Sequence, residues 1–314
     1  MDDSLFVQRR NNFSNLDIVD DFTSLILATV AEVLDILRDL QGEEEGSRVT
    51  QTREGEWKSW DAEVYGVDDA AEGAYIRLLG DSPYPVVLLS EEAGRVDLTG
   101  GNADAPYYGI SDPFDGSWLY KHGLPFMQYS SLALYDSNFN PVTAVTGDVF
   151  NRQLAFANEH GAFISDLRFN MIDSIHRLDE MYRIQHRGEA VTDIGDACVE
   201  TYVLKPGKFL MPLMDRYRDV VGAFKMLHPN GGPFAFAEAA AGQIDVYFAF
   251  EQPYVDIYSG LMIAEKAGLI VTDFSGAPLP KPTVDHETIY NILVSRNRSL
   301  HDQTLKLIAQ CERG

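Results

Sequence analysis

The sequence predicts a layered α/β protein, and three observations lead to that class. A long amphipathic helix stands near the N-terminus, strand-like segments fill the middle of the chain, and strands then alternate with helices. A strand-rich half followed by an alternating half is typical of sheets covered by layers of helices. The 314 residues are enough for two domains of ordinary size, which we expect at 1–188 and 189–314.

The spacing of apolar residues defines the first elements. From Asp17 to Leu40 these residues recur at intervals of three and four, which predicts one long helix. The stretch from Glu43 to Trp60 is charged and without periodicity, so we expect a loop there. A second helix is expected from Asp68 to Leu79, and the short apolar run Val86–Leu89 is predicted to be a buried strand.

Strands dominate the middle of the chain. They are expected, between turn residues, at 107–110, 131–135, 142–149, 154–157 and 162–164. The polar stretch from Leu167 to Asp196 shows no pattern that assigns it. After it the sequence predicts strands at 244–248, 269–272 and 289–294, and helices at 234–241, 257–267 and 300–311.

The composition is ordinary for a globular protein except in its charge. The chain has 48 acidic and 25 basic residues, a formal net charge of −23. A surface this negative repels nucleic acid and anionic membranes, so neither is expected as a partner. With only two cysteines, no signal-peptide pattern at the N-terminus and no apolar run long enough for a membrane span, we expect a cytoplasmic protein.

Three acidic clusters stand at the ends of predicted elements. Glu91 and Glu92 follow the strand Val86–Leu89, the segment Asp112–Ser117 follows another strand, and Asp256 precedes a predicted helix. Open α/β sheets bind ligands at strand ends, and Mg²⁺ prefers a few carboxylates together with water and phosphate oxygens. Taken singly, each cluster has an ordinary structural explanation as a turn, a solvated loop or a helix N-cap, and the same holds for Asp68.

The segment Asp112–Ser117 suits a metal and phosphate site for stereochemical reasons. Pro113 keeps Asp112 out of the α region, so that Asp112 can close a strand while Asp115 starts a turn. The turn also directs the carbonyl of Phe114 towards the carboxylates. Gly116 lets the backbone come close to an oxyanion, which the following amides can bind.

These residues together resemble the inositol monophosphatase and fructose-bisphosphatase superfamily. Asp112–Ser117 is similar to the DPxDGT signature, Leu89–Glu92 to the GEE segment, and Val255–Gly268 to the motif WDxAAGxxIxxEAGG. Asp68 and Glu72 fit the D-x-x-x-E helix start found upstream in the family. The resemblance extends from about residue 17 to 310 in the family's order and spacing.

The resemblance implies a five-layer α-β-α-β-α fold and a lithium-sensitive, Mg²⁺-dependent phosphomonoesterase that is commonly a homodimer. Two or three Mg²⁺ ions would be bound in each active site, with Asp112 bridging two of them. The implied metal ligands are Glu91, Asp112, the carbonyl of Phe114, Asp115 and Asp256. Asp68 and Ser117 match the pair that orients and deprotonates the attacking water, the amides of Gly116 and Ser117 would bind phosphate, and Glu92 would support the ligands from behind.

Departures from the family pattern lie mainly in the expected substrate wall. Ser117 replaces Thr, Val255 replaces Trp, and Asn230–Pro233 stands where a Gly-Ser-Ala type segment is usual. The family's ring-contacting acid falls near Ala249 or is displaced to Glu251. The expected substrate is therefore a small phosphomonoester, an inositol monophosphate or a sugar phosphate such as fructose bisphosphate.

Two alternatives to that substrate class stay open. One is a 3′-phosphorylated adenosine nucleotide, and the other is a non-catalytic, divalent-ion-binding homologue. Lys121, Lys205 and Lys208 are candidates for contacting a second anion of the substrate, although surface lysines are usually only solvated.

Overall fold

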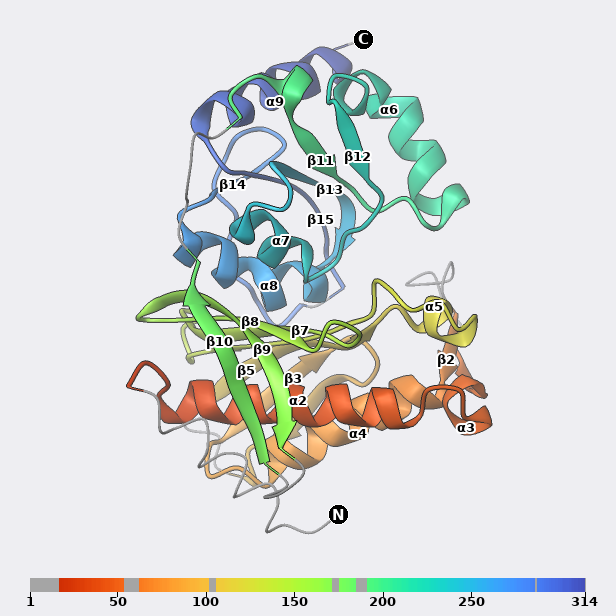
Figure 1. Ribbon diagram of the computed structural model, residues 1–314, viewed down its shortest axis with the longest axis vertical. Coiled ribbons are helices and arrows are strands. Elements are labelled where there is room, and N and C mark those ends of the chain that lie inside the picture. The colour runs from red at the N-terminus through yellow and green to blue at the C-terminus, as the bar shows by residue number, and fades with distance from the viewer. Residues whose placement is uncertain are drawn as a thin grey trace.

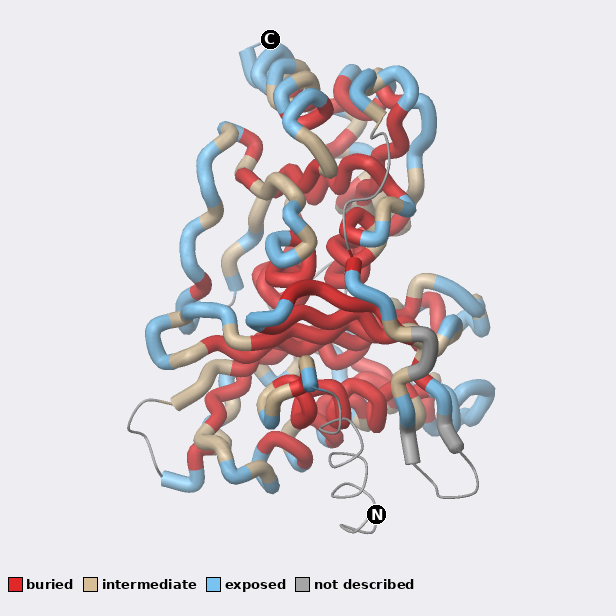
Figure 2. The backbone as a smooth tube through the Cα atoms, turned by 60° about the vertical axis from the view of Figure 1, so that its left-hand side comes forward, coloured by how far each residue is buried: buried red, intermediate tan, exposed pale blue. Residues whose placement is uncertain are grey.

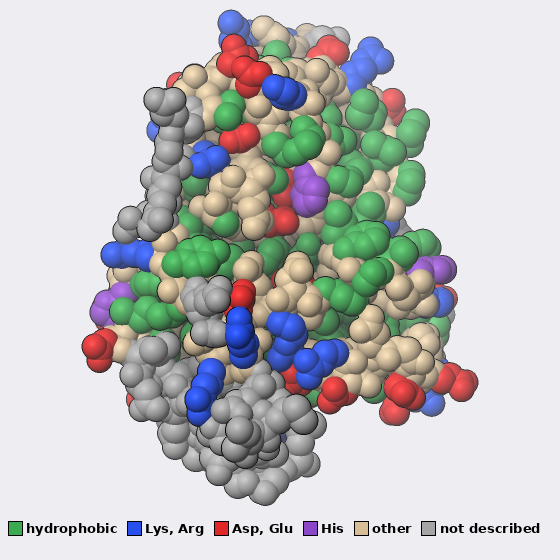
Figure 3. Space-filling view, viewed as in Figure 1, with side chains coloured by type: hydrophobic (Ala, Val, Ile, Leu, Met, Phe, Trp, Pro, Cys, Tyr) green, Lys and Arg blue, Asp and Glu red, His purple; other side chains and the backbone are tan. Residues whose placement is uncertain are grey.

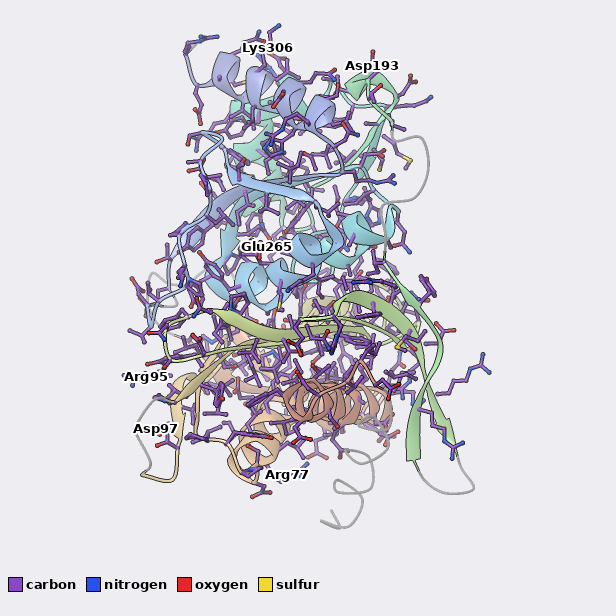
Figure 4. The ribbon with its side chains drawn as sticks, turned by 90° about the vertical axis from the view of Figure 1, so that its left-hand side faces the viewer. Arg77, Arg95, Asp97, Asp193, Glu265 and Lys306 are labelled. Carbon is purple, nitrogen blue, oxygen red and sulfur yellow. The ribbon has the colours of Figure 1, made fainter. Side chains whose placement is uncertain are left out.

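Five alternating layers of helix and sheet make up the computed structural model, which confirms the predicted fold class (Figure 1). The structure describes residues 17–53, 62–101, 106–170, 175–184, 191–285 and 287–313. The first layer is α2 (Asp21–Asp39) and α4 (Gly66–Gly80), the third α7 (Ala235–Ala241) and α8 (Tyr254–Ala267), and the fifth α6 (Met211–Val221) and α9 (Arg298–Cys311). In the side view of Figure 4, the labelled residues Arg77 on α4, Glu265 on α8 and Lys306 on α9 identify the first, third and fifth layers.

The second layer is an eight-stranded sheet in the described residues, ordered β10-β9-β8-β7-β6-β5-β3-β4. Its strands are β3 (Val86–Ser90), β4 (Gly94–Leu98), β5 (Tyr107–Asp115), β6 (Tyr129–Tyr135), β7 (Pro141–Asp148), β8 (Gln153–Asn158), β9 (Gly161–Asn170) and β10 (Ile175–Arg183). β3 and β5 are parallel, and the other neighbours are antiparallel. The carboxyl ends of β3 and β5 therefore lie at one edge of the sheet.

The fourth layer is a five-stranded sheet in the described residues, ordered β12-β11-β13-β15-β14. Its strands are β11 (Cys198–Glu200), β12 (Met226–His228), β13 (Val246–Pro253), β14 (Ile270–Asp273) and β15 (Ile289–Ser295). The shorter elements are α3 (Glu44–Ser47), β1 (Val49–Thr52), β2 (Glu63–Tyr65), α5 (Ser117–Lys121), a 3₁₀ turn (Ile194–Asp196) and a π-helical turn (Pro206–Leu210).

Three apolar clusters fill the spaces between the layers, so the central strands of the two large sheets are buried on both faces (Figure 2). Leu25, Leu34 and Tyr75 of the first layer pack beneath the eight-stranded sheet. The largest cluster joins that sheet to α7, α8 and the five-stranded sheet. Because Asp256 lies on α8 in the middle layer, this cluster fixes its position relative to the eight-stranded sheet.

Helix α2 confirms the long helix predicted from Asp17 to Leu40, although it begins four residues later than expected. The helix begins at Asp21 because the side chain of Asp20 accepts a hydrogen bond from the amide of Thr23 at 2.6 Å and caps it. Strands β3 and β6–β8 and helices α7 and α9 also form where the sequence predicts them, within a few residues.

Two segments differ from expectation because their strands carry no apolar alternation. The expected loop at 43–60 contains α3 and β1, and β1 pairs with β2 although all four of its residues are exposed; residues 54–61 lie outside the described residues. The unassigned polar stretch extends β9 and adds β10, which pair as antiparallel neighbours. The sequence also did not predict β4, β11, β12, α5 or α6.

Two predicted boundaries beside the acidic clusters are wrong. The strand expected to end at Ile110 continues to Asp115, since a bulge between Asp112 and Asp115 accommodates Pro113 in the pairing with β6. Helix α8 begins at Tyr254, so Asp256 lies in its first turn and does not precede it. Both changes leave the carboxylates at element ends.

The predicted domain boundary between residues 188 and 189 lies outside the described residues and stays a prediction.

The surface charge is unevenly distributed. On the face seen in Figure 3, a group of Lys and Arg side chains lies low in the middle with Asp and Glu to its right, and side chains of both signs are mixed near the top. Among the described helices, none is both long and apolar enough to cross a membrane.

Candidate active site

Four of the predicted ligand residues line one small cavity of about 40 Å³. Glu91 directly follows β3, Asp112 and Asp115 lie in the last part of β5, and Asp256 is in the first turn of α8. The parallel pairing of β3 with β5 brings the first three together, and the packing of α8 adds the fourth. Asp112 is only 2% exposed and Asp256 8%, so the cavity holds concentrated, largely buried negative charge.

The backbone around Asp112 fixes the direction of its carboxylate. The amide of Phe114 donates to Asp112 Oδ1 at 3.1 Å, and the hydroxyl of Ser131 donates to the carbonyl of Asp112 at 3.3 Å. At Gly116 the φ angle is 108° and an added Cβ would lie 2.5 Å from the carbonyl oxygen of Met127. The sequence Asp-Gly-Ser therefore needs glycine at its centre to turn from β5 into α5.

Asp68 and Ser117 are brought together from two helices 49 residues apart. The hydroxyl of Ser117 donates to Asp68 Oδ1 at 2.6 Å. The other oxygen, Oδ2, accepts from the amide of Tyr65 at 2.8 Å, which ties the carboxylate to the start of α4. Asp68 is the third residue of α4 and only 2% exposed. The expected pair is thus hydrogen-bonded, with Ser117 lining the larger cavity beside the carboxylates.

Glu72 supports the turn that presents Glu91, a contact that the sequence did not assign. Ser90 donates to Glu72 Oε2 at 2.6 Å, and the amide of Ala93 donates to the same oxygen at 3.3 Å. Burial raises the pKa of Glu72, and the negative charge of Asp112 adds to this rise. Glu72 follows Asp68 by four residues, so both carboxylates lie on one face of α4. This spacing was visible in the sequence, although the role of Glu72 was not.

Glu92, expected behind the ligands, forms an ion pair with Arg53. Both residues line the larger cavity, of about 470 Å³, together with Glu91, Asp115, Gly116 and Ser117. Arg53 follows β1, whose position the sequence did not predict, so this cation was not a candidate before the fold was known.

The candidate lysines differ in their positions. Lys205 lines both cavities. Lys208 forms an ion pair with Glu251 at 2.9 Å, and Lys121 one with Glu63 at 3.3 Å. Lys205 is therefore the lysine best placed to contact a second anion of a ligand in these cavities.

The segment 230–233, here called the wall segment, closes the carboxylate cavity on one side. At Gly232 the φ angle is 74°, and an added Cβ would collide with the carboxylate of Asp115. The amide of Gly232 donates to the hydroxyl of Tyr247 at 3.1 Å. Asn230 and the apolar side chains of Trp118, Phe126 and Leu204 line the larger cavity.

A separate acidic group has the close geometry of metal ligands. Within the described parts of the chain, ligand atoms of Glu200, His228 and Glu238 all lie within 4.8 Å of one another. The four carboxylates of the small cavity all line it, but no three of them meet the same 4.8 Å criterion within the described parts of the chain.

Comparison with known proteins identifies the relatives of this chain. The model of the inositol monophosphatase family matches residues 19–313. A protein named Nus factor SuhB from Pasteurella multocida is 26% identical over 222 residues, covering 70% of this chain and 74% of the relative. A Thermotoga maritima protein named fructose-1,6-bisphosphatase/inositol-1-monophosphatase is 27% identical over 199 residues, covering 63% and 66%.

Solved structures show the same fold. The extragenic suppressor protein suhB of Bartonella henselae matches with a TM-score of 0.70 and 20% identity, covering 92% of this chain and 98% of that one. A Thermotoga maritima IMPase matches with a TM-score of 0.67 and 20% identity, covering 94% and 99%. At these identities the likeness concerns the fold alone.

Proposed function

The chain belongs to the inositol monophosphatase family, and on that premise we propose that it is a Mg²⁺-dependent phosphomonoesterase acting on a small phosphorylated metabolite. The family match and the relatives named as phosphatases support phosphatase activity in general. The observation that supports this chain's own activity most directly is the cavity lined by Glu91, Asp112, Asp115 and Asp256, beside the hydrogen-bonded pair of Asp68 and Ser117.

The donor set of the small cavity fits magnesium. Its four carboxylates are hard oxygen ligands, and the carbonyl of Phe114 would add a fifth oxygen. We propose that Asp112 would hold the metal together with Glu91, Asp115 and Asp256, and that Glu92 and Glu72 hold the turn around Glu91. Mg²⁺ bound here would supply Lewis-acid stabilisation of phosphoryl oxygens and lower the pKa of a bound water.

The chain's own residues would then orient the substrate and the attacking water. The Ser117 hydroxyl, which donates to Asp68 Oδ1 at 2.6 Å, is positioned by that carboxylate, and the pair would accept the water's proton. The amides of Gly116 and Ser117 would bind the phosphate next to the carboxylates. Lys205 would attract a second anionic group of the substrate.

The substrate is proposed to be an inositol monophosphate or a sugar phosphate such as fructose bisphosphate. A second candidate, a 3′-phosphoadenosine nucleotide, is favoured by the larger cavity, because the aromatic side chains of Trp118 and Phe126 line it together with Ser117, and aromatic rings can pack against a base. The name Nus factor among the relatives keeps the third possibility, a non-catalytic homologue, as an outcome of the test.

Phosphate release tests the proposal. The purified protein should hydrolyse at least one of inositol monophosphate, fructose 1,6-bisphosphate and 3′-phosphoadenosine 5′-phosphate, whereas a phosphodiester serves as the negative control. EDTA should abolish the release and added Mg²⁺ restore it, because the carboxylates alone cannot stabilise an anionic transition state. Release unchanged by EDTA would contradict the mechanism, and none from any substrate would favour the non-catalytic alternative.

Lithium inhibition and a homodimeric state belong to the same proposal, because the family resemblance implies both. The absence of nucleic-acid and membrane partners also remains part of it on the grounds of the net charge of −23, and a cytoplasmic location on the grounds of the low cysteine content.

A further inference from the structure

Glu200, His228 and Glu238 lie outside the carboxylate cavity, at one end of the five-stranded sheet. Glu200 ends β11 and His228 ends β12, and the parallel register of these strands sets the two residues side by side. Glu238 comes from α7 in the neighbouring layer. His228 Nδ1 is 3.1 Å from Glu200 Oε2, and ligand atoms of all three residues lie within 4.8 Å of one another. The group is open to solvent on the side of His228, whose side chain is 34% exposed.

The carboxyl group of Glu200 is fully buried, and only one of its oxygens, Oε2, lies against His228. Glu200 is 0% exposed, and its Oε1 atom has no hydrogen-bond partner among the described residues. A buried carboxylate oxygen without a donor or a positive charge is strongly destabilising. Burial raises the pKa of Glu200 to about 8, although its hydrogen bond with Glu238 offsets part of the rise. Burial and the nearby charge of Glu200 raise the pKa of Glu238 to about 8. Two charged carboxylates this close repel each other, and a cation between them would relieve that repulsion.

We infer that Glu200, His228 and Glu238 form a second divalent-cation site, for a transition metal such as Zn²⁺. Two carboxylates and one imidazole supply three ligands, which leaves a tetrahedral ion one open position. The imidazole distinguishes this site from the all-oxygen cavity, because nitrogen ligands favour Zn²⁺ over Mg²⁺. The inference stands on this group alone and does not depend on the proposed phosphatase activity.

Hydrogen bonds connect the group to the wall segment. Asn230 Nδ2 donates to Glu238 Oε2 at 3.2 Å and to the hydroxyl of Tyr129 at 3.0 Å. Two residues further on, Gly232 abuts the carboxylate of Asp115. A metal ion held by His228 and Glu238 would therefore fix both sides of the wall segment, and its role is to stabilise this side of the active site.

Zinc binding to the whole protein tests the inference. Metal-free protein is titrated with Zn²⁺ calorimetrically in excess Mg²⁺, which occupies the carboxylate cavity. We expect one Zn²⁺ per chain and a higher melting temperature. His228→Ala should weaken zinc binding by more than about 100-fold. A residue that only supports a metal ligand through a hydrogen bond costs about 10–100-fold when it is replaced, so a larger loss identifies His228 as a ligand. The matched control is His160→Ala, at an exposed histidine of the β8–β9 turn.

Two further measurements keep the result unambiguous. Because burial raises the pKa of both Glu200 and Glu238 and only their deprotonated forms bind a metal ion, zinc binding should release protons, measured by titration in buffers of different ionisation enthalpy. Asp112→Asn should leave zinc affinity unchanged, which separates this site from the carboxylate cavity. Zinc affinity unchanged in His228→Ala would overturn the inference. So would no zinc binding at all, since the two glutamates would then share a proton in place of a metal.

Discussion

Replacing Asp112 by Asn should lower kcat/KM by about 10³-fold or more, equivalent to about 4 kcal/mol of transition-state stabilisation. The change removes one negative charge from the carboxylates proposed to hold Mg²⁺, so the Mg²⁺ concentration needed for activity should rise as well. Asn keeps the shape and an Oδ1 acceptor for the amide of Phe114. The measurement is steady-state phosphate release over a range of Mg²⁺ concentrations.

The fold should tolerate this substitution. The charge of Asp112 helps to raise the pKa of both Glu72 and Tyr75, so removing it relieves repulsion in a buried region. The melting temperature of Asp112→Asn should therefore be unchanged or higher. Asp219→Asn, at an exposed position of α6 in the outer layer, is the matched control and should keep full activity. A folded Asp112→Asn protein with full activity would refute the proposed metal site.

The Asp68–Ser117 pair should behave as one catalytic unit. Ser117→Ala and Asp68→Asn should each lower kcat by about 10²–10⁴-fold, the range for loss of general-base assistance. The double mutant should lose little more than the worse single mutant, because the hydroxyl and the carboxylate act through one hydrogen bond. Ser117→Ala should leave Mg²⁺ affinity nearly unchanged. The measurement is a double-mutant cycle on kcat, together with a Mg²⁺ titration.

A purely structural role for the pair makes a different prediction. Asp68 also accepts from the amide of Tyr65, and loss of a helix-terminal bond costs about 0.5–2 kcal/mol of the free energy of unfolding. Asp20→Ala at the start of α2 and Ser82→Ala after α4 are matched controls, since both remove helix-terminal hydrogen bonds away from the site. They should lower stability without changing kcat. Losses that multiply in the double mutant would contradict the joint role.

Local patterns were sufficient for the elements that bring the site together. The apolar run of β3, the periodicity of α2 and the Asp-Pro-Phe-Asp-Gly-Ser segment are patterns of neighbouring residues and can be recognised without knowing the fold. The structure contains a strand at the first, a helix at the second and the end of β5 at the third. The order of the acidic clusters then indicated the family, whose match covers residues 19–313. The metal-ligand roles remain a proposal.

Features that depend on distant partners could not be predicted. β1 has four exposed residues and is a strand only because β2 pairs with it. β5 extends through Pro113 because β6 provides the pairing. Glu200 and His228 are 28 residues apart without any spacing motif, and only the parallel register of β11 and β12 makes them neighbours.

The position of bound metal ions tests the central claim most directly. Crystals of the protein soaked in Mn²⁺, which can replace Mg²⁺ at oxygen ligands, are measured at the manganese absorption edge. We predict at least one anomalous peak within coordination distance of Asp112 and of one or more of Glu91, Asp115 and Asp256. Anomalous peaks found only away from these four carboxylates, in a preparation that releases phosphate with Mn²⁺, would contradict the account.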